Sequence, residues 1–162
     1  AKLRTERHVE LVIIGKPNGD SASTKAFEDL GLTDCVSYVH GVPDQRIVEL
    51  YSEAEVACVP SLYEGFSLPA IEAMSCGVPL VTTTGGALPE VTGTHGETCF
   101  QVPPGDSDAL AGMLRTVLAD PGLRARVGAA GRQRVIDQWS WHHTAIRTVE
   151  QYRALLDETV GR

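Results

Sequence analysis

The 162-residue sequence contains no apolar run that approaches the ~20 residues a helix needs to cross a bilayer. Its start, AKLRTERHVE, lacks the apolar core of a secretory signal, and we therefore expect a cytoplasmic protein. Basic residues are also in the minority, because 14 Lys and Arg face 21 Asp and Glu, for a net charge of −7. This charge repels a phosphate backbone, and no basic cluster is interleaved with aromatic residues. We expect no nucleic-acid binding.

Cysteine is sparse and scattered. Cys35, Cys58, Cys76 and Cys99 stand far apart, without a CxxC pair. This spacing disfavours a zinc site or a disulfide framework and favours buried, reduced thiols. The five histidines likewise form no recognisable ligand set.

Short β-branched runs recur along the chain with amphipathic segments between them. The runs cover 9–15, 36–41, 56–61, 78–84 and 97–102, and they are near-continuously hydrophobic instead of alternating, which suits strands covered on both faces. Alternation of such strands with helices predicts parallel βαβ units. We expect an α/β fold, a Rossmann-like three-layer α/β/α sandwich with a parallel sheet, formed as a single domain over 1–162.

Helix signals lie between and after these runs. Asp44 and Asp106 are placed to cap amphipathic helices with apolar stripes. From Pro121 onward the strand pattern stops, and two helices are predicted, one ending near 138 and one starting near 141 after the capping candidate Ser140. The last helix carries one apolar face, made of Ala145, Val149, Tyr152 and Leu156.

The segment 60–79, PSLYEGFSLPAIEAMSCGVP, predicts a strand end, a short loop and a helix. Pro69 suits the first helical turn, and Gly77 suits the left-handed position after the last turn. Such a helix start aims unpaired N–H groups and a positive dipole end at one point, which suits a phosphate. Glu64 in the loop and Glu72 in the helix can face the same ligand and accept hydrogen bonds from its hydroxyl groups. A diphosphate flanked by two diol-bearing sugars, a nucleotide sugar, meets both conditions.

Glu64 and Glu72 in EGFSLPAIE resemble the Glu-x7-Glu motif of the retaining glycosyltransferase family 4 and its GT-B relatives. The flanking residues 56–91, the VPPGD at 102–106 and the closing QWSW at 138–141 are similar to that family too. The resemblance covers nearly all of the chain, and it implies transfer of a hexose from a nucleoside-diphosphate sugar to an acceptor.

The resemblance implies a role for each matching residue. Glu64 is the expected catalytic residue and contacts hydroxyls of the donor hexose, while Glu72 holds the ribose diol. Backbone N–H groups at Phe66, Ser67 and Leu68, next to Gly65, are implied to hold the diphosphate. The loop at Gly41, Val42 and Pro43 borders the base. The family uses no metal, and no cofactor is expected.

The resemblance also implies which half of the enzyme this is. It matches the C-terminal, donor-binding half of the GT-B fold, with the first strand of the sheet and a basic pair for the diphosphate expected before residue 1. The helices 121–162 are expected to cross toward an N-terminal domain that binds the acceptor. By this interpretation the chain alone is inactive in transfer, and its unpaired strand edge invites self-association.

Several alternatives remain open. Asp106 and Asp108 imitate a metal-binding DxD motif, but acids at a helix start are also explained by capping. Lys16 and His40 end strands at the edge where α/β proteins bind ligands, and Gly85 and Gly86 either let backbone approach the donor or form a turn. The chain can also be a non-catalytic nucleotide-sugar binding or interaction module. A nicotinamide enzyme is disfavoured because GKPNGD at 15–20 is a poor substitute for GxGxxG.

Overall fold

A computed structural model describes residues 1–17 and 22–160, so residues 18–20 of the GKPNGD segment lie outside the described residues. The chain forms two compact units, Ala1–Glu53 (unit 1) and Ala54–Arg162 (unit 2). The expectation of one domain over 1–162 stays a prediction.

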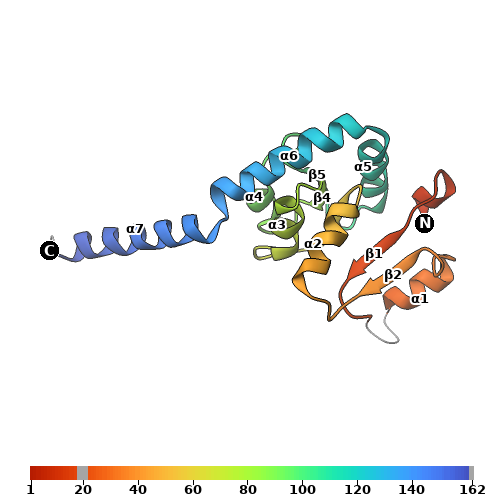
Figure 1. Cartoon of the computed structure of the whole chain (residues 1–162), viewed down its shortest axis with the longest axis horizontal. Helices are drawn as coiled ribbons and strands as arrows, with labels where there is room; N and C mark the ends of the chain where they lie inside the picture. The colour runs from red at the N-terminus through yellow and green to blue at the C-terminus, as the bar shows by residue number, and fades with distance from the viewer. Residues whose placement is uncertain (18–21, 161–162) are drawn as a thin grey trace. The chain divides into compact units, whose positions relative to one another are not determined.

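Unit 1 contains two parallel strands, β1 (Leu11–Ile14) and β2 (Val36–Val39), paired from Leu11 opposite Val36 to Ile14 opposite Val39. A short 3-10 helix (Lys2–Thr5), α1 (Ala22–Asp29) and α2 (Asp44–Glu53) complete it (Figure 1). Asp44, expected before the helix as its cap, is instead the first helical residue. An acidic side chain in the first turn still interacts favourably with the helix dipole.

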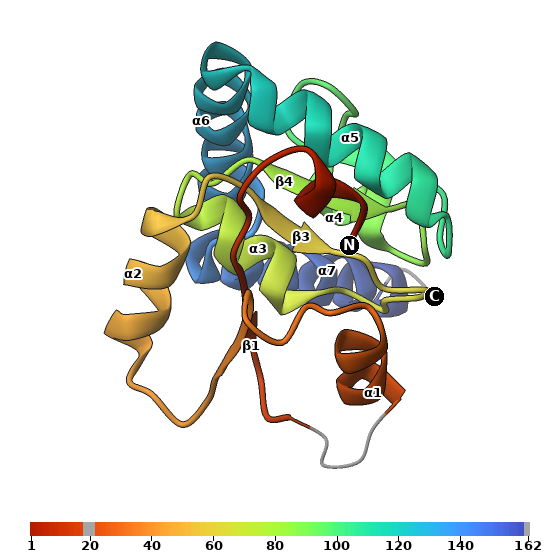
Figure 2. The same cartoon turned by 90° about the vertical axis from the view of Figure 1, so that its right-hand side faces the viewer.

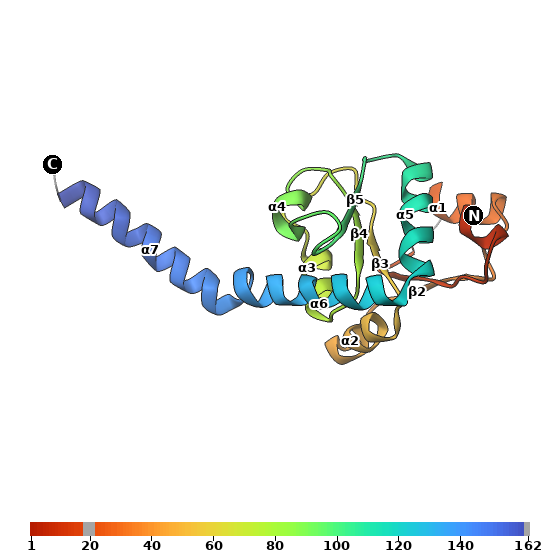
Figure 3. The same ribbon diagram turned by 90° about the horizontal axis from the view of Figure 1, so that it is seen from above.

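Unit 2 holds a three-stranded parallel sheet in the order β3-β4-β5. Its strands are β3 (Ala57–Val59), β4 (Leu80–Thr83) and β5 (Phe100–Val102), and its helices are α3 (Leu68–Ser75), α4 (Leu88–Thr92), α5 (Ser107–Ala119), α6 (Pro121–Gln138) and α7 (Trp141–Val160). Figure 3 shows α5 on one side of the strands and α3 and α4 on the other. These layers confirm the predicted α/β class with parallel strands.

Burial separates the two sheets. All four residues of β4 are buried, because it lies between two strands and two helical layers. In β1, by contrast, Leu11, Val12 and Ile14 are 42–46% exposed, so the expectation of burial on both faces is wrong for this strand. Within the described part of unit 1, β1 pairs only with β2. Burial of a strand on both faces needs layers packed against those faces, which an apolar run alone does not ensure.

The core of unit 2 lies between the central strands and the helices α5 and α6. Val81, Phe100, Val117 and Val127 form a buried cluster, and Leu110, Met113 and Leu114 of α5 pack against it. The apolar stripe predicted for this helix therefore faces the sheet. Asp106 caps α5 as predicted, since its carboxylate accepts hydrogen bonds from the backbone N–H groups of Asp108 and Ala109.

Helix α6 is joined to α5 at Asp120, where the chain changes direction (Figure 2), and its arginines bind the ends of other helices. Arg124 donates to the carbonyls of Val117 and Leu118 at the end of α5, and Arg132 donates to the carbonyl of Ser75 at the end of α3. Arg134 donates to the carbonyls of Glu90 and Val91 in α4. Cationic donors at helix C-termini satisfy free carbonyls and oppose the negative dipole end.

All four cysteines are free thiols, as expected. Cys99 is buried and the other three are half-buried. Burial raises the pKa of Cys58 to about 11 and also raises the pKa of Cys99. Both thiols are therefore protonated at neutral pH and poor nucleophiles.

Helix α7 begins at Trp141 as predicted, and the backbone N–H of His143 donates to the capping hydroxyl of Ser140 at 3.2 Å. Its apolar side chains are accessible, with Trp141 89%, Tyr152 65% and Leu156 64% exposed. The crossing of this helix toward another domain stays a prediction. No described helix is both long enough and apolar enough to span a membrane.

A pair of helical glycines tests how tightly α6 is packed. A Cβ on Gly128 would overlap the carbonyl oxygen of Gly77, whereas a Cβ on Gly112 in α5 meets no atom within 4 Å. Gly128→Ala should therefore lower the free energy of unfolding by about 1–3 kcal/mol through overpacking. Gly112→Ala should raise it by up to about 1 kcal/mol, because alanine favours the helix. Urea unfolding measures both, and equal effects of the two substitutions would contradict this account of the α6 contact.

Candidate functional site

The start of α3 is an unusual helix N-terminus. Its N-cap residue, Ser67, has a left-handed backbone with φ 78°, and no side chain caps the helix. The Ser67 side chain is buried, and among the described residues its hydroxyl has no hydrogen-bond partner. Pro69 lies in the first turn and Gly77 follows the helix with φ 77°, both as predicted.

The backbone N–H groups of Phe66, Ser67 and Leu68 are the donors expected to hold a diphosphate. Among hydrogen bonds within the described part of the chain, none uses these three groups as donors. Phe66 and Leu68 are exposed. Three consecutive unpaired donors next to the positive end of a helix form an arrangement that binds an anion.

Glu64 is held by a hydrogen bond that the sequence analysis did not foresee. Its Oε1 accepts a hydrogen bond of 2.7 Å from the hydroxyl of Ser61, the residue that follows the end of β3 by two positions. The Glu64 side chain is half-buried. The only available signal was the position of a serine three residues before the glutamate, a spacing typical of many loops.

Gly85 and Gly86, two of the predicted donor-site residues, contact the Glu64 loop. A Cβ on Gly85 would overlap the carbonyl of Leu62, and a Cβ on Gly86 would overlap the carbonyl of Glu64. Gly86 also pairs with Glu64 in an isolated parallel bridge, and the N–H of Ala87 donates to the carbonyl of Glu64 at 2.8 Å. The two glycines thus allow the segment after β4 to approach the backbone of the Glu64 loop. Their approach to a donor stays a prediction.

Glu72 lies in the second turn of α3 and is exposed. It belongs to the same strand, loop and helix as Glu64, so the two glutamates share one β3–α3 unit. The carbonyl of Glu72 accepts hydrogen bonds from the N–H of Cys76 and the hydroxyl of Ser75. Its carboxylate makes no hydrogen bond to any described residue.

Phe66 connects the loop to the end of α6. Its ring meets that of Trp139 edge-on, with the ring centroids 5.2 Å apart. The indole N–H of Trp139 donates to the carbonyl of Val91 at 3.1 Å. Sequence reasoning missed this role for Trp139, because the contact joins residues 73 positions apart.

The remaining predicted residues lie in unit 1. Gly41 has φ 65°, Val42 is half-buried and Pro43 is exposed, directly before α2. Lys16 and His40 are exposed beyond the ends of β1 and β2. The approach of these residues to a donor stays a prediction, since Glu64 and Glu72 belong to unit 2.

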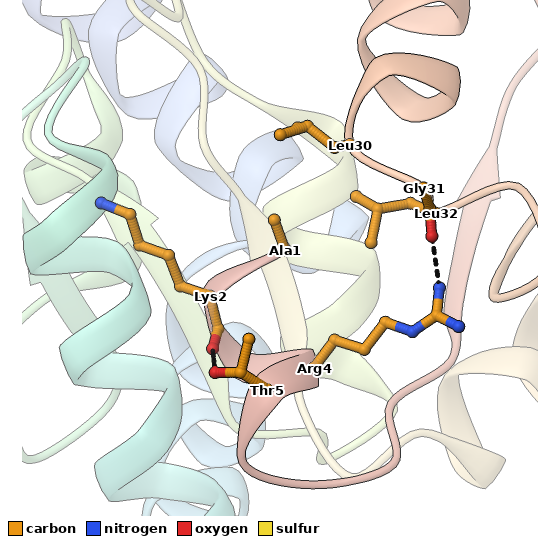
Figure 4. A pocket seen from close by; sticks show the side chains of 7 residues that line it. All are labelled: Ala1, Lys2, Arg4, Thr5, Leu30, Gly31 and Leu32. Atoms are coloured by element: carbon orange, nitrogen blue, oxygen red, sulfur yellow. Dashed lines mark hydrogen bonds between the residues drawn. The ribbon is translucent and has the colours of Figure 1, made fainter.

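Unit 1 also has a hollow of its own, drawn in Figure 4, which lies between the 3-10 helix and the residues after α1. Arg4 crosses it, and its guanidinium donates to the carbonyl of Gly31 at 2.6 Å. Arg4 also pairs with Asp34, and this hydrogen-bonded ion pair lowers the pKa of the Asp34 carboxyl. The guanidinium of Arg4 is therefore already paired within this hollow.

Asp106, the first acid of the DxD-like pair, caps α5 with its carboxylate. Capping therefore explains why an acid stands at this position. Across residues 1–17 and 22–160, no group of three or more His, Cys, Asp or Glu side chains is arranged to hold a metal ion. The expectation of a metal-independent protein stays a prediction.

A parallel α/β unit whose loops and helix starts meet at the carboxyl end of its strands is Rossmann-like, and the GT-B glycosyltransferases are built on such units. Solved structures of this class superpose on the chain. Sucrose-phosphate synthase from Thermosynechococcus elongatus gives a TM-score of 0.84 at 31% identity and covers 96% of this chain and 41% of its own. The fold is shared also by Anabaena HepE in complex with UDP, with a TM-score of 0.80 at 23% identity, 90% of this chain and 41% of its own.

The chain belongs to the family "Glycosyl transferases group 1", whose model matches residues 1–134. Among its relatives is the MMP alpha-(1->4)-mannosyltransferase of Mycolicibacterium hassiacum, 44% identical over 94% of this chain and 37% of the relative. The O-antigen chain mannosyltransferase B of Escherichia coli is 38% identical over 74% of this chain and 30% of the relative. The chain thus spans about a third of the length of these relatives.

Ser67 provides a test of the site's backbone. A left-handed non-glycine residue costs about 1–3 kcal/mol, and a buried hydroxyl without a partner adds to this cost. Ser67→Gly should therefore raise the free energy of unfolding by about 1 kcal/mol, and Ser67→Ala, which removes only the hydroxyl, should gain less.

Ser75→Gly is the matched control, because Ser75 is the last residue of the same helix and does not have a left-handed backbone. It should lose up to about 1 kcal/mol. The measurement is urea unfolding of all three variants, and a loss of stability in Ser67→Gly would show that the left-handed conformation carries no strain.

Proposed function

We propose that this chain forms the donor site of a retaining glycosyltransferase that moves a hexose from a nucleoside-diphosphate sugar to an acceptor. Mannose is the first sugar to test, because two relatives with 44% and 38% identity are named as mannosyltransferases. The relatives are about three times as long as this chain. Acceptor binding and sugar transfer are therefore proposed for a whole protein of that length.

One observation carries the proposal: the three unpaired N–H groups of Phe66, Ser67 and Leu68 stand beside a carboxylate that is fastened in the same loop. A helix start with free N–H groups binds anions, so we expect an anionic group of the ligand at these three donors. A free carboxylate beside a phosphate would be repulsive, whereas a carboxylate beside a phosphate-linked sugar accepts hydrogen bonds from its hydroxyls. The pairing of the two features therefore favours a sugar phosphate over a simple phosphate ligand.

Roles within the site follow from this arrangement. The diphosphate lies at the start of α3, Glu64 accepts hydrogen bonds from the hexose, and Glu72 accepts them from the ribose diol one turn further along the helix. Gly85 and Gly86 support the Glu64 loop from β4. Solved HepE binds UDP, a ligand that contains both the diphosphate and the ribose this division requires.

The two glutamates are separable by experiment. Glu72→Ala should weaken binding of nucleoside diphosphate and nucleoside-diphosphate sugar equally, by about 10- to 100-fold, because a hydrogen bond to a charged group contributes about 1.5–3 kcal/mol. Glu64→Ala should weaken only the sugar nucleotide. Calorimetric titration of the full-length protein with UDP, GDP, UDP-glucose and GDP-mannose measures both effects, with Glu49→Ala on the exposed face of α2 as a control. The assigned roles would be reversed if Glu72→Ala spared nucleotide binding while Glu64→Ala abolished it.

Retention of configuration is tested on the product. Transfer from an α-linked nucleotide sugar by the full-length protein should give an α-glycoside, identified in NMR spectra by the one-bond coupling between the anomeric carbon and its proton, which distinguishes the two anomers of mannose as well as those of glucose. The proposal concerns a retaining enzyme, so a β-linked product from the α-linked donor would refute it. Because equilibrating hydrolysis products can obscure the result, the spectrum is recorded on the purified glycoside.

A further inference from the structure

The loop that carries Glu64 is fastened to β4 and the segment after it at both ends. At the start of the loop, the hydroxyl of Thr83 donates a hydrogen bond to the carbonyl of Ser61 at 2.6 Å and accepts one from the N–H of Gly85 at 3.2 Å. At its end, the carbonyl of Glu64 accepts the N–H of Ala87. Thr83 is 2% exposed, so these bonds are shielded from water and hold the backbone from Ser61 to Glu64 in one conformation.

Within this fixed backbone, Ser61 acts on the Glu64 side chain alone. Its hydroxyl donates to Oε1 of Glu64 at 2.7 Å, the length of a good charge-assisted bond. In the described part of the chain, Oε2 has no hydrogen-bond partner and is left to accept from a ligand. The serine thus occupies one carboxylate oxygen and directs the other.

We infer that Ser61 is a positioning residue that presets Glu64 for the donor sugar. This inference rests on the proposed function, since it gives Glu64 a sugar to bind. A glutamate side chain that is free to rotate loses rotamer entropy when it binds, and a side chain already held in place loses less. Removing the serine hydroxyl should therefore weaken contacts made through Glu64 and leave contacts made through α3 unchanged.

Ser61→Ala is the direct test, because it keeps the carbonyl that Thr83 binds. In the full-length protein, its affinity for the sugar nucleotide, GDP-mannose or UDP-glucose, should fall about three- to tenfold, while its affinity for GDP or UDP stays unchanged. Ser61→Thr retains a hydroxyl and should restore most of the sugar-nucleotide affinity. Ser52→Ala, which removes an exposed hydroxyl bound to the carbonyl of Val48 in α2, is the matched control and should change neither affinity.

The same titration in a Glu64→Ala background separates the outcomes. If Ser61 acts through Glu64, Ser61→Ala has no further effect once the carboxylate is absent. An equal loss for nucleotide and sugar nucleotide, or an undiminished loss in the Glu64→Ala background, would overturn the positioning role. If Glu64→Ala itself leaves sugar-nucleotide affinity unchanged, the proposed function fails. If Glu64→Ala weakens it and Ser61→Ala does not, only the inference about Ser61 fails.

Discussion

The close backbone contact between the loop after β3 and the segment after β4 is the interaction on which the candidate site depends. Gly86 lies against the carbonyl of Glu64, and any Cβ at this position would overlap that oxygen. The contact is possible because parallel strands end at the same edge of the sheet, which brings their following loops together. Because Gly85 and Gly86 have no side chains, this segment can pack directly against the loop that carries the Glu64 carboxylate.

Helix α6 gives the site its second support. Its arginines bind carbonyls at the ends of α3 and α5 and in α4, so α3 is held at its C-terminal end by Arg132. At the end of α6, the ring of Trp139 packs edge-on against that of Phe66, in the loop between β3 and α3. The N–H groups at the start of α3 have no partner among the described residues, whereas the end of the helix and the loop before it are held by side chains of α6 and by Trp139.

Capping residues, prolines and glycines predicted most helix boundaries correctly. The start of α2 and the burial of β1 were not predicted correctly, for physical reasons. Pro69, Gly77, Asp106 and Ser140 act on backbone within four residues, so their effect on helix boundaries follows from sequence alone. Asp44 was predicted to be the N-cap of α2 and is its first residue instead. An acid at the N-cap and an acid in the first turn look the same in a sequence, so the boundary is uncertain by one residue. The burial expected for β1 was wrong because an apolar run specifies the strand and not the layers that cover its faces.

The sequence by itself determined the α/β class, the strand-loop-helix unit with Glu64 and Glu72, and the family, because these rest on residue type and short spacing. Only the tertiary structure decided what holds Glu64 in place. Ser61, Thr83 and Gly86 meet through the pairing of β3 with β4, and Trp139 reaches Phe66 from the far end of α6. Contacts between residues more than 20 positions apart leave no periodic or motif signal, since they depend on how the layers pack and not on the order of neighbouring side chains.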